Sequence, residues 1–102
     1  MEIDILNWLE KWFVSNCNGD WEHSYGITIE TLDNPGWDIK IDLKNTPLAN
    51  EKLEYTYTKK NENDWFGIKI EKAEFYAFGD PNKLSFLLEL FKKFVEEKTS
   101  KA

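Results

Sequence analysis

The chain has 102 residues, a formal net charge of −6 and no arginine. A length of this order suits one domain, so we expect residues 1–102 to fold as a single unit. Nucleic acid is a poor ligand for such a chain, because its recognition depends on Lys and Arg side chains that neutralise phosphates. A surplus of acidic side chains suits a basic partner instead, although it also keeps many small proteins dispersed in water.

The sequence has one cysteine and one histidine, Cys17 and His23. This count excludes an internal disulfide and a zinc site of the usual Cys/His type, and no other pattern indicates a metal or a cofactor. The N-terminus lacks the basic segment and long apolar run of a signal peptide, and no apolar stretch reaches membrane-spanning length. We therefore expect a cytoplasmic protein that uses no cofactor and does not contact a membrane.

Residues 2–17 have apolar side chains at three- and four-residue steps, which predicts an amphipathic helix. Gly19 follows it and can supply the left-handed residue that ends a helix. The expected buried stripe of this helix comprises Ile5, Leu9, Trp12 and Phe13, flanked by Leu6 and Trp8.

Residues 25–32 and 37–43 alternate between apolar and polar side chains, which is typical of strands with one buried face. Between them, Asp33-Asn34-Pro35-Gly36 predicts a tight turn. Pro35 would take its second position, and Gly36 would accept the positive φ of its third. The two strands are expected to form a hairpin whose core-facing residues include Ile27, Ile29, Ile39 and Ile41.

A polar loop over residues 44–52 leads to three further alternating segments, at 52–58, 64–71 and 73–79. In the first of these, Leu53, Tyr55 and Tyr57 are expected to face the core. A second amphipathic helix follows Asp80 and Pro81, which suit the N-cap and the first helical position. Its expected buried stripe comprises Leu84, Leu87, Leu88, Phe91, Phe94 and Val95, and residues 99–102 are expected to fray.

The order helix, five strands, helix predicts an α+β domain. Short connections between successive strands favour a five-stranded antiparallel meander, and the single apolar stripe of each helix needs the sheet as its partner. We expect the N-terminal and C-terminal helices to pack on one face of the sheet and to leave the other face open. By alternation, this open face should display Trp65 among the acidic residues Glu30, Asp38, Asp42, Glu54 and Glu71, with Lys40 and Lys69 between them.

Three segments carry a resemblance to a known family: WLEKW at 8–12, GDWEHSYGI at 19–27 and LDNPGW at 32–37. They resemble the immunity protein 53 family, whose members are antitoxins of bacterial polymorphic toxin systems. NDW at 63–65 and GDPNKL at 79–84 continue the resemblance, which covers nearly the whole chain. The resemblance implies a protein that neutralises a cognate protein toxin by binding it and that needs no catalytic residues.

With this resemblance, the acidic and aromatic surface becomes a hypothesis for the binding of a basic, nuclease-type toxin. The candidate partner-binding residues are Glu30, Asp38, Asp42, Glu54, Trp65, Trp21 and Trp37. For Trp21, a place in the core is an equally good interpretation. Two other hypotheses are a small enzyme that uses Cys17 with His23 or a carboxylate pair, and an acidic adaptor domain.

Overall fold

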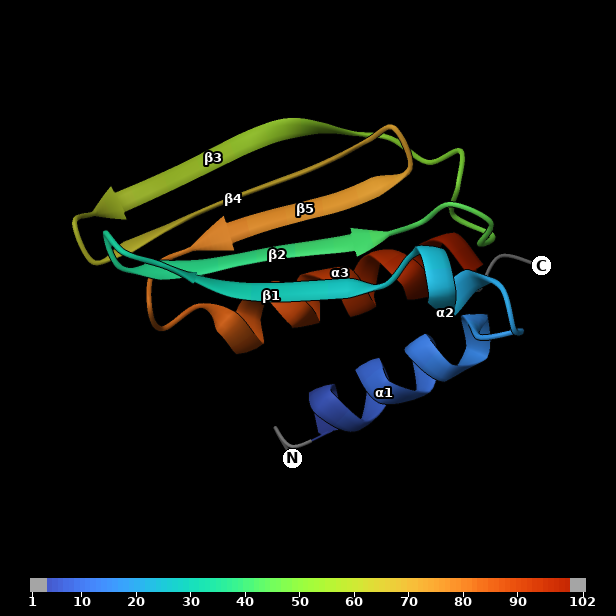
Figure 1. Ribbon diagram of the computed structural model, residues 1–102. Coiled ribbons are helices and arrows are strands. Elements are labelled where there is room, and N and C mark those ends of the chain that lie inside the picture. Colours follow the sequence, from blue (N-terminus) through green and yellow to red (C-terminus); the bar gives the residue numbers. More distant parts are fainter. Residues whose placement is uncertain (1–3, 100–102) are drawn as a thin grey trace.

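The computed structural model describes residues 4–99. Within this range the chain forms three helices and five strands: α1 (Asp4–Asn16), α2 (Trp21–Ser24), β1 (Ile27–Leu32), β2 (Gly36–Asp42), β3 (Leu53–Asn61), β4 (Asp64–Glu71), β5 (Glu74–Gly79) and α3 (Leu84–Thr99) (Figure 1). The predicted start of the first helix at residue 2 and most of the predicted frayed tail lie outside the described residues.

All five strands belong to one antiparallel sheet with the order β1-β2-β5-β4-β3. The predicted α+β class and the antiparallel sheet are therefore confirmed, but a continuous meander would place β3 beside β2. Instead, β2 pairs with β5, and the chain crosses from β2 to the far edge before it returns through β4. The middle position suits β5, because its Phe75 and Ala77 are among the most buried residues of the sheet.

Both long helices cover the same face of the sheet (Figure 1). Helix α3 lies against β5, and α1 packs along α3. The rings of Trp8 and Trp12 from α1 meet the ring of Phe91 edge-on, at centroid distances of 5.9 and 5.0 Å. The predicted stripes are buried at their centres, whereas Leu6, expected at the flank of the first stripe, is 56% exposed.

Helix α2 is a short element that the sequence pattern did not predict. Its Trp21 is only 2% exposed and donates a hydrogen bond from Nε1 to the Lys44 carbonyl at 2.8 Å. The ring of Trp21 meets those of Trp12 and Phe13 at 6.0 and 5.8 Å. Since Trp21 lies in the core, the expectation that it could contact a partner is corrected.

The predicted hairpin of β1 and β2 is present, and its register places Ile27 opposite Ile41 and Ile29 opposite Ile39. A turn joins the two strands at residues 33–35 as predicted, but its predicted conformation is wrong, because the Asn34–Pro35 peptide is cis and Gly36 does not have a positive φ. Gly36 is required by close packing instead. A Cβ on this residue would collide with the Gly79 carbonyl oxygen and would lie 3.1 Å from the Trp65 ring.

Strand β3 contains an irregularity that reverses part of the predicted pattern. Leu53 lies opposite Ile70, but the next register pair is Thr56 with Ile68, so three steps on β3 match two on β4. One extra residue turns every following side chain to the other face. Tyr55 and Tyr57 therefore face away from the helices, and the expectation that they would be buried in the core is wrong.

Candidate functional site: an aromatic trough

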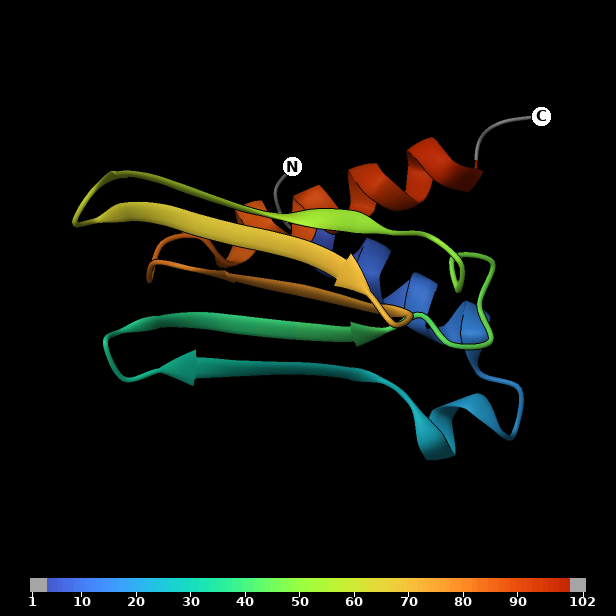
Figure 2. The ribbon, with the colours of Figure 1, turned by 90° about the horizontal axis from the view of Figure 1, so that it is seen from above.

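The face of the sheet opposite α1 and α3 is here called the outer face, and no helix of residues 4–99 lies over it (Figure 2). Its centre is the ring of Phe78 on β5, which lies 6.3 Å from Tyr55, 5.9 Å from Tyr57 and 6.3 Å from Trp65 between ring centroids. The ring of Tyr76 on the same strand also lies near Phe78, at a centroid distance of 5.8 Å. Tyr55 and Tyr57 are 57% and 48% exposed, so this aromatic surface is largely open to solvent.

Two glycines on the outer face make room for these rings. A Cβ on Gly67 would lie 2.5 Å from the Phe78 ring, which shows that the ring rests on the bare backbone of β4. Gly36 gives the same space to the ring of Trp65 on the neighbouring side. Large aromatic rings can therefore lie close to the sheet and leave a depression beside them.

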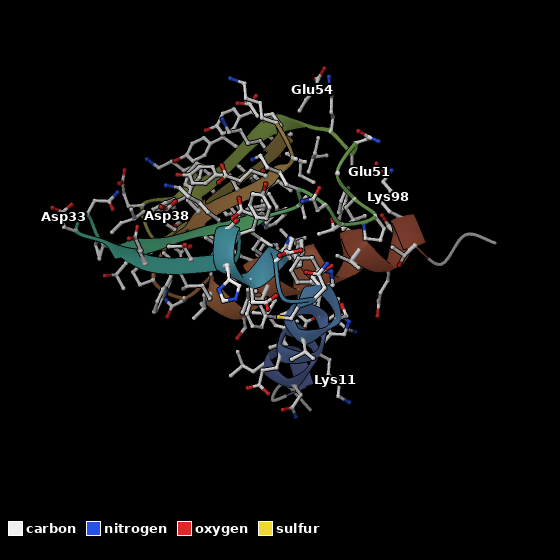
Figure 3. The ribbon with its side chains drawn as sticks, turned by 45° about the vertical axis from the view of Figure 1, so that its right-hand side comes forward. Lys11, Asp33, Asp38, Glu51, Glu54 and Lys98 are labelled. Carbon is white, nitrogen blue, oxygen red and sulfur yellow. The ribbon has the colours of Figure 1, made fainter. Side chains whose placement is uncertain are left out.

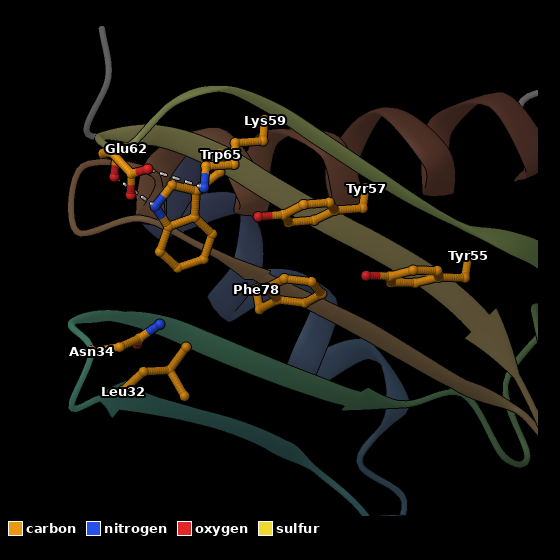
Figure 4. A pocket seen from close by; sticks show the side chains of 8 residues that line it. All are labelled: Leu32, Asn34, Tyr55, Tyr57, Lys59, Glu62, Trp65 and Phe78. Atoms are coloured by element: carbon orange, nitrogen blue, oxygen red, sulfur yellow. Dashed lines mark hydrogen bonds and ion pairs between the residues drawn. The ribbon is translucent and has the colours of Figure 1, made fainter.

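The depression is a hollow of about 440 Å³ at the end of the outer face. Figure 4 shows Phe78 at its centre, the end of the β1–β2 hairpin on one side, and the tyrosines and Trp65 on the other. We call it the aromatic trough and define it by the residues that line it: Leu32, Asn34, Tyr55, Tyr57, Lys59, Glu62, Trp65 and Phe78.

The wall at Trp65 is held by a buried carboxylate. Asp80 is completely buried, and its Oδ2 accepts hydrogen bonds from the Trp65 backbone N–H at 3.0 Å and from the Lys83 ammonium at 2.7 Å. Its Oδ1 accepts the backbone N–H of Asn82 at 2.8 Å, and Lys83 also contacts Asp64 at 2.7 Å. The position of Trp65 is thus tied to the connection between β5 and α3.

The pKa shifts of Asp80 and Lys83 favour the charged forms that make this ion pair. Burial alone would raise the pKa of the Asp80 carboxyl, but hydrogen bonds from Lys83, Trp65 and Asn82 outweigh it, and the pKa is lowered. Hydrogen bonds to Asp64 and Asp80 raise the pKa of Lys83 in turn. Both partners therefore stay charged at neutral pH.

Three of the segments that carried the family resemblance meet at this end of the molecule. LDNPGW at 32–37 supplies one side of the trough, NDW at 63–65 supplies Trp65, and GDPNKL at 79–84 supplies Asp80 and Lys83. The Trp37 indole joins two of them, because its Nε1 donates to the Pro81 carbonyl at 2.9 Å. Trp37 was predicted to bind a partner, and this bond shows that it also supports the fold.

The acidic residues predicted for the outer face do not form one exposed row. Asp38 is only 9% exposed, so the expectation that it lies in water is wrong. Its register partner on β5 is Phe78. Burial first, and the Asp38 carboxylate second, raise the pKa of Tyr76 to about 12. Within residues 4–99, Oδ1 of Asp38 has no hydrogen-bond partner.

The remaining carboxylates are dispersed over the outer face and its edges. Asp42 is half-buried and accepts the backbone N–H of Gly26 at 3.0 Å, so it serves the fold. Glu30 is exposed on β1, and Glu54 is exposed on β3 at the opposite edge, far from the hairpin tip that carries Asp33 (Figure 3).

Lysines dilute the acidic charge at the centre of the outer face. The ammonium groups of Lys40 and Lys69 lie 6.0 and 5.9 Å from the centre of the Tyr76 ring. Lys69 also forms an ion pair with Glu71 at 3.0 Å. The distinctive feature of this face is therefore its aromatic trough.

The structure gives no support to chemistry at Cys17 and His23. The Cys17 thiol lies 3.3 Å from the Phe13 carbonyl, and burial, followed by the charge of Glu22, raises its pKa. A raised pKa disfavours the thiolate that a nucleophile requires. His23 is exposed on α2. In residues 4–99, no group of His, Cys, Asp and Glu is placed to hold a metal, and no helix has the length and hydropathy to cross a membrane.

The model of a protein family described as immunity protein 53 matches residues 6–96. The matched region contains every residue that lines the aromatic trough, together with Asp80 and Lys83. No curated protein and no solved structure matches the chain.

Proposed function

The chain belongs to the immunity protein 53 family, and from this premise we propose that it binds a cognate protein toxin through the aromatic trough and blocks the toxin's activity. Inhibition by occlusion requires complementary surfaces and no catalytic group. The proposal therefore does not depend on Cys17 or His23.

The observation that carries the choice of surface is the exposure of Tyr55 and Tyr57 beside Trp65 and Phe78. Tyrosine and tryptophan are enriched among the residues that contribute most to protein–protein affinity. Trp65 is also held in advance by its bond to Asp80, so that binding loses little conformational freedom there. Exposed aromatic area on a fixed scaffold is what a tight inhibitor needs.

Charge supports a basic toxin, such as one that acts on nucleic acid. The chain carries a net charge of −6, and Glu30, Asp33 and Glu62 are exposed on or near the outer face. Acidic groups around an aromatic centre accelerate the approach of a basic protein. The sequence also predicted acidic residues around an exposed aromatic side chain, but the acidic rim proposed here omits the buried Asp38 and includes Asp33 and Glu62.

The test begins with capture of the toxin from the source organism by the tagged protein, followed by mass spectrometry. Co-expression of the captured toxin with the wild-type protein should restore growth of cells that the toxin alone kills. The double substitution Tyr57→Ala and Trp65→Ala should abolish protection. Phe86→Ala is the matched control, because Phe86 is an aromatic residue that is 41% exposed on α3, away from the trough. Full protection by the folded double variant would exclude the aromatic trough as the toxin-binding surface.

A further inference from the structure

We propose that the aromatic trough receives an arginine side chain of the toxin, whose guanidinium lies on the rings and donates hydrogen bonds to the oxygen atoms around them. The inference rests on the proposed function and adds to it the chemical identity of the group that is bound. It follows from the polar atoms of the trough, from the orientation of its rings and from its charge.

The trough offers oxygen atoms that the fold does not use. Within residues 4–99, the hydroxyls of Tyr55 and Tyr57 and the side-chain amide of Asn34 make no hydrogen bond that meets ordinary geometric limits. The Glu62 carboxylate is paired with Lys59 at 3.5 Å, and its side chain is 90% exposed. A long ion pair in water is worth little and is readily exchanged for a better one. The trough can therefore accept several hydrogen bonds from one donor group.

The rings of Tyr55 and Tyr57 are stacked nearly parallel to the ring of Phe78, with ring centroids 6.3 and 5.9 Å away. The planes of Tyr55 and Tyr57 each deviate by 17° from the plane of Phe78. Figure 4 shows the two tyrosine hydroxyls directed toward the Trp65 end of the trough. A guanidinium is flat, carries five N–H donors in its plane and stacks on aromatic faces. Its face matches the rings, and its edge matches the surrounding oxygens.

Cations already occupy comparable positions on this sheet. Lys40 and Lys69 hold their ammonium groups about 6 Å from the Tyr76 ring, which adjoins Phe78. These contacts place the chain's own cations on one half of the aromatic surface. The rings of Tyr55, Tyr57 and Phe78 form the other half, and the chain itself has no arginine to place there.

Other occupants fit the trough less well. An anionic side chain would approach a chain of net charge −6 and meet the Glu62 carboxylate. An aliphatic side chain would cover the tyrosine hydroxyls and Asn34 without replacing their hydrogen bonds to water, which costs free energy. A lysine ammonium can contact a ring, but it does not present a flat face together with a row of donors.

The experiment uses three tripeptides as probes: acetyl-Gly-Arg-Gly-amide, its citrulline analogue and its leucine analogue. Citrulline keeps the shape of arginine but carries no charge. Each probe is titrated into the full-length protein at constant ionic strength, and NMR follows the Trp65 indole N–H, assigned through Trp65→Phe, and the ring protons of Tyr55 and Tyr57. We expect the arginine peptide to bind at least about threefold more tightly than the other two, the factor that a weak exposed cation–π contact supplies.

Two variants identify the site of binding. Tyr57→Ala should remove the response of Trp65 to the arginine peptide, and Phe86→Ala should leave it unchanged. Equal binding of the three peptides, or an arginine response that survives Tyr57→Ala, would overturn the inference.

The protection assay separates this inference from the proposed function. A protein that protects cells but shows no selective arginine response keeps its function and refutes the arginine receptor. If the arginine peptide binds selectively but the protein protects cells against no toxin, the proposed function is refuted. The bound arginine side chain would then not come from a toxin.

Discussion

The fully buried Asp80 carboxylate accepts a hydrogen bond from the backbone N–H of Trp65 at 3.0 Å. The same oxygen pairs with Lys83, the residue directly before α3. A single charged group thus links the packing of the last helix to the wall of the aromatic trough. Stability and toxin binding are therefore expected to change together when this group is altered.

Removal of the carboxylate tests the link. Asp80→Ala leaves Lys83 without its buried partner and leaves the N–H groups of Trp65 and Asn82 without an acceptor. Breaking a buried pair of this kind costs about 3 kcal/mol or more of unfolding free energy. Urea denaturation measures the loss, with Asp33→Ala at the exposed hairpin tip as the control. Equal unfolding free energies of the two variants would show that the Asp80 carboxylate and its partners do not stabilise the fold.

The pH dependence of stability gives a second test of the same cluster. Because the pKa of Asp80 is lowered in the fold, its contribution is present above the ordinary value of 3.8 and is lost as the pH falls through the folded pKa. Because the pKa of Lys83 is raised, its contribution is present below 10.5 and is lost as the pH rises through the folded pKa.

The difference in unfolding free energy between wild type and Asp80→Asn should therefore be constant near neutral pH. It should shrink below pH 3.8 and again above pH 10.5. Denaturation at a series of pH values measures this difference. If the difference in unfolding free energy does not change as the pH falls well below 3.8, the lowered pKa of Asp80 is contradicted.

The glycine beneath Phe78 provides a prediction about shape. Gly67→Ala places a methyl group against the Phe78 ring and should displace it, at a cost of about 1–3 kcal/mol. Gly26→Ala is a matched control, because a Cβ at Gly26 meets no atom within 4 Å. Thermal unfolding compares the two variants. Similar melting temperatures of the two variants would contradict the prediction that the Phe78 ring needs the space at Gly67.

Much of the fold follows from local patterns. The alternation from Ile27 to Ile41 predicts the β1–β2 hairpin and its buried face, and the three- and four-residue spacing predicts α1 and α3. These patterns suffice because one buried face leaves a periodic trace in the sequence. Alternation predicts which face a residue is on but not how deeply it is buried. Ile29 faces inward on the edge strand β1, yet its side chain is 39% exposed because the edge is only partly covered.

The candidate site depends on features that local patterns do not contain. The alternation of Leu53, Tyr55 and Tyr57 continues without interruption in the sequence, yet the bulge on β3 moves both tyrosines to the outer face. The pairing of β2 with β5 then brings the end of the hairpin to within reach of β3 and β4. Alternation correctly predicted that Trp65 lies on the outer face. The trough around it could not be predicted, because it depends on the strand order and on the bulge in β3.

The rim charges lead to a prediction about association. Reversing Glu30 and Glu62 to Lys should slow the association of the toxin and weaken its dependence on salt, because exposed charges act mainly on encounter. Both side chains are exposed, so the unfolding free energy should change little. Surface-plasmon kinetics over a salt series measures the effect. Asp38 is unsuitable for this test, because it is buried. If neither salt nor the charge reversals at Glu30 and Glu62 changes the association rate, these acidic residues do not steer the toxin.

The most direct measurement of the central claim is the dissociation rate of the captured toxin from wild type, Trp65→Ala, Tyr57→Ala and the control Phe86→Ala. If the aromatic trough is the docking site, each trough variant should lose roughly 2 kcal/mol of binding free energy, which corresponds to about 30-fold faster dissociation. Phe86→Ala should dissociate at the wild-type rate. Wild-type dissociation from both folded trough variants would contradict the account and place the toxin on another surface.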